Sequence, residues 1–271
     1  MKDTIIEKLK KIEKEKNVKV LYACESGSRA WGFPSKDSDY DVRFIYVHTK
    51  ERYLSIDPIG IGSGKENENR DVIEHPINDL LDISGWDLTK TLKLFRSCNP
   101  PLLEWMHSNI QYYQAFSTIN KLRELQKEIF TPRTCILHYL HMAKGNFREY
   151  LQGEQVKIKK YFYVLRPVLA AKWIEQYNEF PPLEFETLLD KMVPAGDLKK
   201  EITTLLKRKI KGDELDLEPR IDVINTFLNS EIKRLEEYGK ALERPTEEVF
   251  KKATDKFNQL FRDTLDEVWN R

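Results

Sequence analysis

The stretch "DYDVRFIYV", which begins at Asp39, joins two carboxylates to a run typical of a buried β-strand. Side chains alternate between the two faces of a strand, so Asp39, Asp41 and Arg43 are expected on one face and the apolar residues between them on the other. A buried carboxylate is costly unless a positive partner or hydrogen bonds compensate it. The chain therefore needs a sheet with one apolar face under helices and one face that carries charge.

The spacing of the two acids suits a divalent cation. Residues two apart on a strand are about 6–7 Å apart at Cα, so both side chains can converge on one ion. Magnesium prefers carboxylate and phosphate oxygens, and a two-metal phosphoryl-transfer site needs a carboxylate that bridges both ions. We therefore expect Asp39 and Asp41 to bind metal together with a third acid from elsewhere, and Arg43 to form an ion pair with one of them.

A glycine-serine pair precedes the acidic strand and follows another predicted strand, residues 18–24. Gly27 allows a positive φ or a close approach of the backbone. Ser28 and the amides after it are expected to hold phosphate oxygens, especially where a helix begins. Arg29 is expected either to pair with a neighbouring acid or to contact a triphosphate.

Composition excludes several classes of partner. The formal net charge of +1 gives no global field toward nucleic acid or membrane, so such a partner needs a local patch. The three cysteines form no CxxC pair, which favours a reducing compartment. No run has the length of a membrane span and no signal peptide is evident, so we expect a cytoplasmic protein that does not bind membranes.

Periodicity divides the chain into an α+β part and a helical part. Residues 3–16 read as an amphipathic helix, 40–47 as a strand, and 71–75 and 79–83 as short strands; 56–70 reads as a glycine-rich loop. A Ser-Gly turn is expected at Ser84, before a helix that carries Leu88 and Leu92. We expect a small mixed sheet with helices in a catalytic domain, residues 1–115.

The remaining residues, 116–271, are expected to form an all-helical domain. Strand signals vanish, and helical patterns are broken at Gly153, at "FPP" (180–182), at "PAG" (194–196), at Gly212, and at Gly239 with Pro245, which gives five or six helices. The last helix has a continuous apolar stripe, and Thr246 is its expected N-cap. "CILHYLH" places a cysteine and two histidines on one helix face, where structural packing is favoured over zinc binding.

Three motifs give the chain a family resemblance. "SGSRAWGFPSKDSDYDVRFIYV", "DISGWDLTKTLKLFRSCNPPLLEWMHS" and "KKYFYVLRPVLAAKW" resemble the DNA polymerase β nucleotidyltransferase superfamily. Within it they are similar to the predicted nucleotidyltransferases linked to bacterial RNA repair, the YcgL-like or RlaP family. The resemblance extends from about Lys19 to Leu189. It implies a polymerase-β-like core and a third metal-binding acid on a later strand.

The third acid is assigned by context. Asp82 in "LDI" has the hydrophobic-acid-hydrophobic setting that the superfamily uses, while Asp79, Glu74 and Asp71 remain alternatives because spacing does not choose among them. The expected metal ligands and catalytic residues are therefore Asp39, Asp41 and Asp82, with two Mg²⁺ or Mn²⁺ ions.

A basic segment is the expected opposite wall of the nucleotide cleft. Residues 133–178 contain eight Lys or Arg and three Glu, although the whole chain is nearly neutral. The resemblance implies that the helical domain contacts the triphosphate and base, with Lys160, Tyr161 and Arg166 as candidates. The alternatives are a basic helix face in solvent, and core packing for the tyrosine.

Together these features predict a metal-dependent transfer of a nucleoside monophosphate from an NTP to an acceptor hydroxyl. The resemblance favours an RNA end as acceptor, in RNA repair, and a protein or small molecule stays open because the same core serves all three. A non-catalytic nucleotide- or RNA-binding module and an antitoxin-like interaction protein are the other classes. The sequence does not indicate which NTP is used or the oligomeric state.

Overall fold

The computed structural model describes residues 1–271 except 37, 57–70, 79, 214 and 271. The chain forms two compact units. Unit 1 contains Met1–Gly27, Asp39–Ile129 and Thr246–Arg271, and unit 2 contains Ser28–Ser38 and Phe130–Pro245. The chain therefore passes twice from unit 1 into unit 2 and twice back, whereas the expected division lies at a single point between residues 115 and 116.

Unit 1 is built on a five-stranded sheet in the order β3-β4-β2-β1-β5. The strands are β1 (Val18–Glu25), β2 (Tyr40–His48), β3 (Val72–Asn78), β4 (Leu81–Asp87) and β5 (Gln111–Gln114). β2 and β4 are parallel, and the other neighbouring pairs are antiparallel. The predicted small mixed sheet is confirmed.

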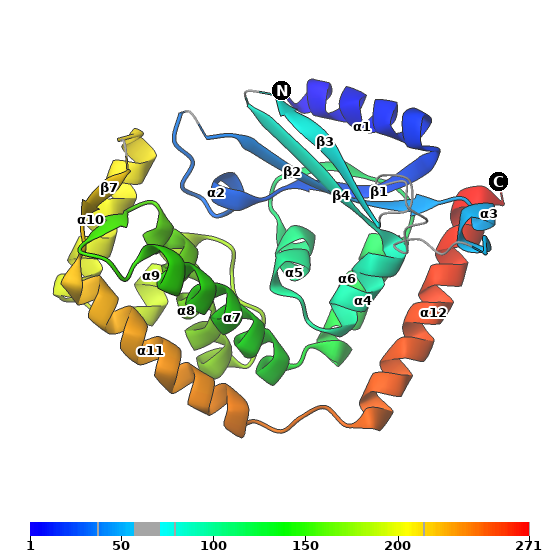
Figure 1. The fold of residues 1–271 in the computed structure, drawn as a ribbon. Helices are drawn as coiled ribbons and strands as arrows, with labels where there is room; N and C mark the ends of the chain where they lie inside the picture. The colour runs from blue at the N-terminus through cyan, green and yellow to red at the C-terminus, as the bar shows by residue number, and fades with distance from the viewer. Residues whose placement is uncertain (37, 57–70, 79, 214, 271) are drawn as a thin grey trace. The chain divides into compact units, whose positions relative to one another are not determined.

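Helices cover both faces of this sheet, and Figure 1 shows α1 along one face and α4, α5 and α6 on the other side. The helices of unit 1 are α1 (Lys2–Lys16), α3 (Lys50–Tyr53), α4 (Leu88–Arg96), α5 (Pro100–His107), α6 (Thr118–Ile129) and α12 (Glu247–Trp269). The short helix α2 (Gly27–Ala30) begins at Gly27 of unit 1, and its other residues belong to unit 2. α12 packs against α4 and α6.

The core under α1 explains the pattern of β2. Val42 and Phe44 are fully buried, and they pack in one cluster with Ile5 and Leu9 of α1 and with Ile83 of β4. The alternation predicted for β2 is therefore confirmed. The opposite face at the start of β2 is left for the charged residues.

The predicted Ser-Gly turn at Ser84 is wrong, because both residues lie inside β4. Gly85 packs against the ring of Phe44, and a Cβ at this position would lie 2.3 Å from ring atoms Cε2 and Cζ. Glycine is therefore needed here for close approach in the middle of a strand, and not for a turn.

We expect Gly85→Ala to destabilise unit 1 by about 1–3 kcal/mol, the usual cost of overpacking a core, because a buried aromatic ring cannot move aside freely. The measurement is the midpoint of thermal or urea unfolding followed by circular dichroism. Gly145→Ala in a helix of unit 2 is the matched control, since a Cβ there meets nothing within 4 Å. An equal loss in both variants would contradict the packing argument.

Unit 2 is helical except for one two-stranded sheet. Its helices are α7 (Pro132–Tyr150), α8 (Lys160–Tyr177), α9 (Phe185–Met192), α10 (Asp197–Lys211) and α11 (Asp222–Ala241). The predicted helical second half is confirmed, and two short strands within it, β6 (Gln155–Lys157) and β7 (Leu217–Pro219), pair in an antiparallel manner. α8 contacts α7, α9 and α11, and this position explains why it is apolar nearly all round.

Local signals account for the boundary between α11 and α12. The Thr246 side chain accepts a hydrogen bond from the N–H of Val249, which confirms the predicted N-cap of α12. The predicted break at Gly239 with Pro245 is found just after Gly239, because α11 ends at Ala241 and α12 begins at Glu247. Gly239 itself lies inside α11, where its missing side chain lets Ile136 and Leu137 of α7 approach closely. Throughout the described ranges, each helix is too short or too polar to cross a membrane.

Candidate active site

The parallel register of β2 and β4 brings two predicted ligands together. Asp41 and Asp82 are direct Cα partners across the two strands. Their neighbours Val42 and Ile83 are buried in the core with α1, so the alternation of side chains turns both carboxylates toward the opposite face. Asp82, the acid predicted on a later strand, thus lies beside Asp41 of β2.

Arg43 binds both of these carboxylates. Its Nη2 lies 3.3 Å from Asp41 Oδ1 and 2.7 Å from Asp82 Oδ2, and its Nη1 donates to the carbonyl of Val42 at 3.0 Å. The side chains of Arg43, Asp41 and Asp82 are 19%, 31% and 29% exposed, so solvent and small ions can reach them. The predicted ion pair of Arg43 with an aspartate is confirmed and includes both acids.

Arg43→Gln is expected to lower the stability of the metal-free protein by about 1–2 kcal/mol, because two partly exposed carboxylates lose their shared positive charge. We expect millimolar Mg²⁺ to restore more stability in this variant than in the unchanged protein, since a cation can then occupy the position between the acids. Thermal unfolding in EDTA and in Mg²⁺ measures both effects.

Lys90→Gln is the matched control for this measurement. Lys90 pairs with Asp71 at 2.9 Å in the same unit, and the two side chains are 27% and 34% exposed, so the variant breaks an ion pair of similar exposure with a single carboxylate. If Mg²⁺ stabilises the two variants equally, the acid pair is not a cation site.

Gly27 is fitted to Asp41. Its φ is +59°, and a Cβ at this position would lie 2.1 Å from Asp41 Oδ2. The N–H of Ser26 donates to the carbonyl of Asp41 at 2.8 Å. The turn after β1 therefore lies directly on the carboxylate, and only a glycine leaves room for it.

The other acids are placed differently. Asp39 is exposed and immediately precedes β2. Of the alternatives for the third acid, Asp71 pairs with Lys90, Glu74 is exposed on β3, and Asp79 lies outside the described residues. Among the residues that the structure describes, no group of three or more His, Cys, Asp or Glu side chains could hold a metal ion.

The pair of acids nevertheless fits magnesium. Mg²⁺ is usually held by one or two carboxylates, with substrate phosphates and waters as the remaining ligands. Asp41 and Asp82 supply two oxygen donors in register, and the guanidinium of Arg43 already places positive charge between them. The role of Asp39 as a further ligand stays a prediction.

The predicted phosphate-binding residues Ser28 and Arg29 lie in the short helix α2, in the segment Ser28–Ser38 that belongs to unit 2. Ser28 Oγ lies 3.3 Å from Ser38 Oγ, and Arg29 Nη2 donates to the carbonyl of Ser38 at 2.7 Å. The buried Lys209 of α10 donates to Ser35 Oγ at 3.1 Å. These contacts join α2 to Ser38 and the segment after α2 to α10, all within unit 2.

The candidates on α8 have partners within unit 2. Tyr161 is fully buried, and its hydroxyl donates to Asn225 Oδ1 at 2.6 Å and accepts from the N–H of Ile221 at 2.9 Å. Arg166 is 2% exposed and lies over the ring of Trp31, 4.7 Å from its centroid. The nucleotide contacts predicted for Tyr161 and Arg166 stay predictions.

Lys160 differs from them because it is partly exposed. Its Nζ lies 4.2 Å and 4.9 Å from the ring centroids of Tyr150 and Tyr163. The nucleotide contact predicted for Lys160 stays a prediction.

Glu25 was not among the residues predicted from the sequence, although it touches Asp41. It ends β1, is 0% exposed, and its Oε1 accepts the N–H of Asp41 at 2.7 Å. The available signal was an acid at the end of the apolar run "VLYAC". Its neighbour Cys24 is no candidate nucleophile, because burial raises the pKa of its thiol.

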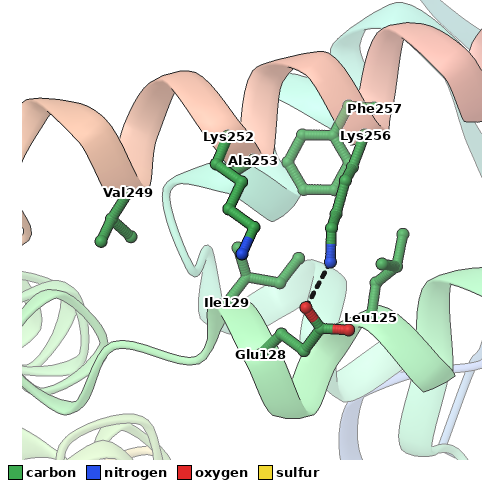
Figure 2. Close-up of a pocket in the computed structure, with 8 residues that line it drawn as sticks. All are labelled: Leu125, Glu128, Ile129, Val249, Lys252, Ala253, Lys256 and Phe257. Atoms are coloured by element: carbon green, nitrogen blue, oxygen red, sulfur yellow. Dashed lines mark hydrogen bonds and ion pairs between the residues drawn. The ribbon is translucent and has the colours of Figure 1, made fainter.

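Two pockets of unit 1 lie along α12 and not at the acids. One, of about 160 Å³, lies between α6 and α12; Figure 2 shows the Lys256–Glu128 ion pair across it and Phe257 in its wall. The other, of about 380 Å³, is lined by residues of α4 and α12 together with Tyr53. Neither pocket is lined by Asp41 or Asp82.

Comparisons with known proteins identify the family of the chain. A family model described as "RlaP: RNA repair pathway DNA polymerase beta family" matches residues 1–263. A curated relative, "Uncharacterized protein YcgL" of Bacillus subtilis (strain 168), is 54% identical over 269 residues, which cover 99% of this chain and 98% of the relative.

The match defines the class of the protein as a polymerase β-type nucleotidyltransferase. The chain belongs to the RNA repair pathway DNA polymerase beta family, RlaP. A crystal structure of a nucleotidyltransferase-like protein from Exiguobacterium sibiricum 255-15 aligns over 97% of this chain and 91% of its own. With 9% identity and a TM-score of 0.33, that similarity is too distant to support an argument.

Proposed function

We propose that the protein transfers a nucleoside monophosphate from an NTP to an acceptor hydroxyl at the end of an RNA. The observation that carries the proposal is the in-register pair Asp41 and Asp82, turned to one face of the sheet and bridged by Arg43. Two carboxylates on adjacent strands beside a glycine turn suit a substrate that brings metal and phosphate together.

In the proposed step the acceptor oxygen bonds to the α-phosphorus while the bond from that phosphorus to the β-phosphate oxygen breaks. Pyrophosphate leaves with the electron pair, and the acceptor proton passes to a carboxylate of the site or to water. Two Mg²⁺ or Mn²⁺ ions, held by Asp39, Asp41 and Asp82, would neutralise the triphosphate and lower the pKa of the acceptor hydroxyl.

The chain's own residues have separable tasks in this proposal. Asp41 and Asp82 hold the charge at the reacting end, and Gly27 lets the backbone lie against Asp41. Ser28 and the amides that follow it would bind phosphate oxygens, and Arg29 and Lys160 are further candidates for nucleotide contacts. Tyr161 and Arg166 would act through the shape of their unit, since both are buried.

An RNA acceptor is favoured by the description of the family, which names an RNA repair pathway. A protein or small-molecule hydroxyl is chemically equivalent for the step itself. The acceptor is therefore the variable that the experiment has to scan.

The test is transfer of label from α-³²P-labelled NTPs, with Mg²⁺ or Mn²⁺, to RNA oligonucleotides that carry different 5′ and 3′ ends. We expect one class of end to gain one labelled nucleotide, and EDTA to abolish the transfer. The Asp39→Asn and Asp41→Asn double variant should bind RNA without transferring label. Equal transfer by this double variant would exclude the metal assignment.

A non-catalytic nucleotide- or RNA-binding module is the second candidate. One observation favours it: Arg43 already pairs with both acids, as a resident counter-ion would in a protein that does no metal chemistry. Tight NTP binding that does not depend on Mg²⁺, with no transfer to any RNA, protein or small-molecule acceptor, would support this alternative.

A further inference from the structure

Glu25 is a buried carboxylate that the proposed chemistry does not use directly. It is 0% exposed, yet both of its oxygens accept hydrogen bonds: Oε1 from the N–H of Asp41 at 2.7 Å, and Oε2 from the hydroxyl of Tyr112. A carboxylate that loses its hydration is tolerated only with such partners. Its burial and these two donors give Glu25 a fixed orientation.

The backbone of Glu25 is fixed as well. Its N–H donates to the carbonyl of Ile110 at 2.9 Å, and its carbonyl accepts from Ser108 Oγ at 2.7 Å. Glu25 therefore connects the segment before β5 with the start of β2 through bonds that hold it from both sides. A movement of its carboxylate would break the bonds to both Asp41 and Tyr112.

The position of Glu25 in the sheet explains what its side chain does. The ladder between β1 and β2 ends at the pair of Glu25 with Val42, so Asp41 lies one residue beyond the last pair. At this point the Glu25 carboxylate accepts a hydrogen bond from the N–H of Asp41. The N–H of Ser26 donates to the carbonyl of Asp41 at 2.8 Å. Both backbone polar groups of Asp41 are thus bonded to the end of β1.

We infer that Glu25 is a positioning residue that fixes the backbone of Asp41, and thereby the direction of the Asp41 carboxylate toward a divalent cation. The inference rests on the proposed function for its consequence, because Asp41 is the ligand being positioned. Glu25 itself does not bind the cation, since both of its oxygens are occupied and buried. Outer residues that orient a metal ligand typically change metal affinity by about 10–100-fold when they are replaced.

The experiment compares three substitutions in the full chain by Mn²⁺ titration, with free Mn²⁺ measured by electron paramagnetic resonance. Glu25→Leu removes the acceptor and should weaken Mn²⁺ binding at least about tenfold. Glu25→Gln keeps an oxygen for the Asp41 N–H and places its NH₂ toward the Tyr112 oxygen, so binding should remain near that of the unchanged protein. Tyr112→Phe is the matched control, because it removes a bond to the same carboxylate and leaves the bond to Asp41.

A second measurement needs no metal. The amide proton of Asp41 should shift upfield in the ¹⁵N–¹H spectrum of Glu25→Leu, and much less in Glu25→Gln, because a carboxylate acceptor deshields its donor. If Glu25→Leu does not fold, Glu25→Gln and Tyr112→Phe still decide: Mn²⁺ affinity lost in both, or in the glutamine variant alone, would overturn positioning through this hydrogen bond.

The outcomes separate this inference from the proposed function. If the unchanged protein binds Mn²⁺ and folded Glu25→Leu binds it equally well, the positioning role is wrong and the proposed function stands. If the unchanged protein binds no Mn²⁺, with or without NTP, the metal-dependent function fails, and an unshifted Asp41 amide in Glu25→Leu would in addition overturn the positioning role.

Discussion

Gly27→Ala is expected to lower nucleotidyl transfer by about 10²-fold, because displacing a catalytic group by about 1 Å has an effect of this size. The new Cβ would lie 2.1 Å from Asp41 Oδ2, and the end of that side chain is the part that can move. The fold itself should survive, since an alanine at a φ of +59° costs only about 1–2 kcal/mol. Initial rates in the α-labelled NTP assay measure the loss.

Gly32→Ala is the control that isolates the displacement of Asp41. Gly32 also has a positive φ, +84°, but the nearest atom to a Cβ there is Glu184 Cγ at 4.0 Å. Both variants should lose a similar amount of stability, and only Gly27→Ala should lose transfer. Similar rates in the two variants would mean that the turn does not have to lie against the carboxylate.

Asp41→Asn and Asp82→Asn are each expected to reduce transfer by about 10²–10³-fold. Each would remove one charge that holds the cation, and losing several kcal/mol of transition-state stabilisation has an effect of this size. Asp39→Asn is expected to behave in the same way, as the third ligand of the proposed site. The control is Asp255→Asn, an exposed acid on α12 of the same unit.

The three single substitutions test different parts of the site. Full activity of Asp39→Asn alone would restrict the ligands to the pair that the sheet register brings together. Full activity of Asp82→Asn would instead show that the β4 acid serves only as a partner of Arg43.

The residues on each face of β2 could be predicted because strand periodicity is local. Side chains alternate between the two faces with a period of two residues. The same reasoning found α1 and the N-cap of α12, which depend on neighbours three or four positions away. Asp82 was assigned by its context in a family resemblance. The parallel register that sets it opposite Asp41 depends on where β4 pairs, which no local pattern specifies.

The features that escaped prediction depend on contacts across long stretches of sequence. The Ser-Gly pair at Gly85 suggested a turn. The constraint that requires this glycine is the ring of Phe44 on another strand, which the local sequence does not reveal. Glu25 was not singled out because its donors lie on Asp41 and Tyr112. Arg166 was singled out as a nucleotide contact in a basic segment, and its burial over the ring of Trp31 could not be foreseen because Trp31 lies far away in the sequence.

The return of α12 to unit 1 has a consequence for synthesis on the ribosome. Trp269 Nε1 donates to the carbonyl of His48 at 2.9 Å, and the side chain of Glu267 accepts from Ser117 Oγ at 2.6 Å. Most of unit 2, Phe130–Pro245, precedes α12 in the chain. It therefore emerges from the ribosome and can fold while unit 1 still lacks α12. The nascent catalytic unit would expose apolar surface of α4 and α6 until translation is nearly finished, which makes it a substrate for chaperones and makes late nonsense mutations damaging.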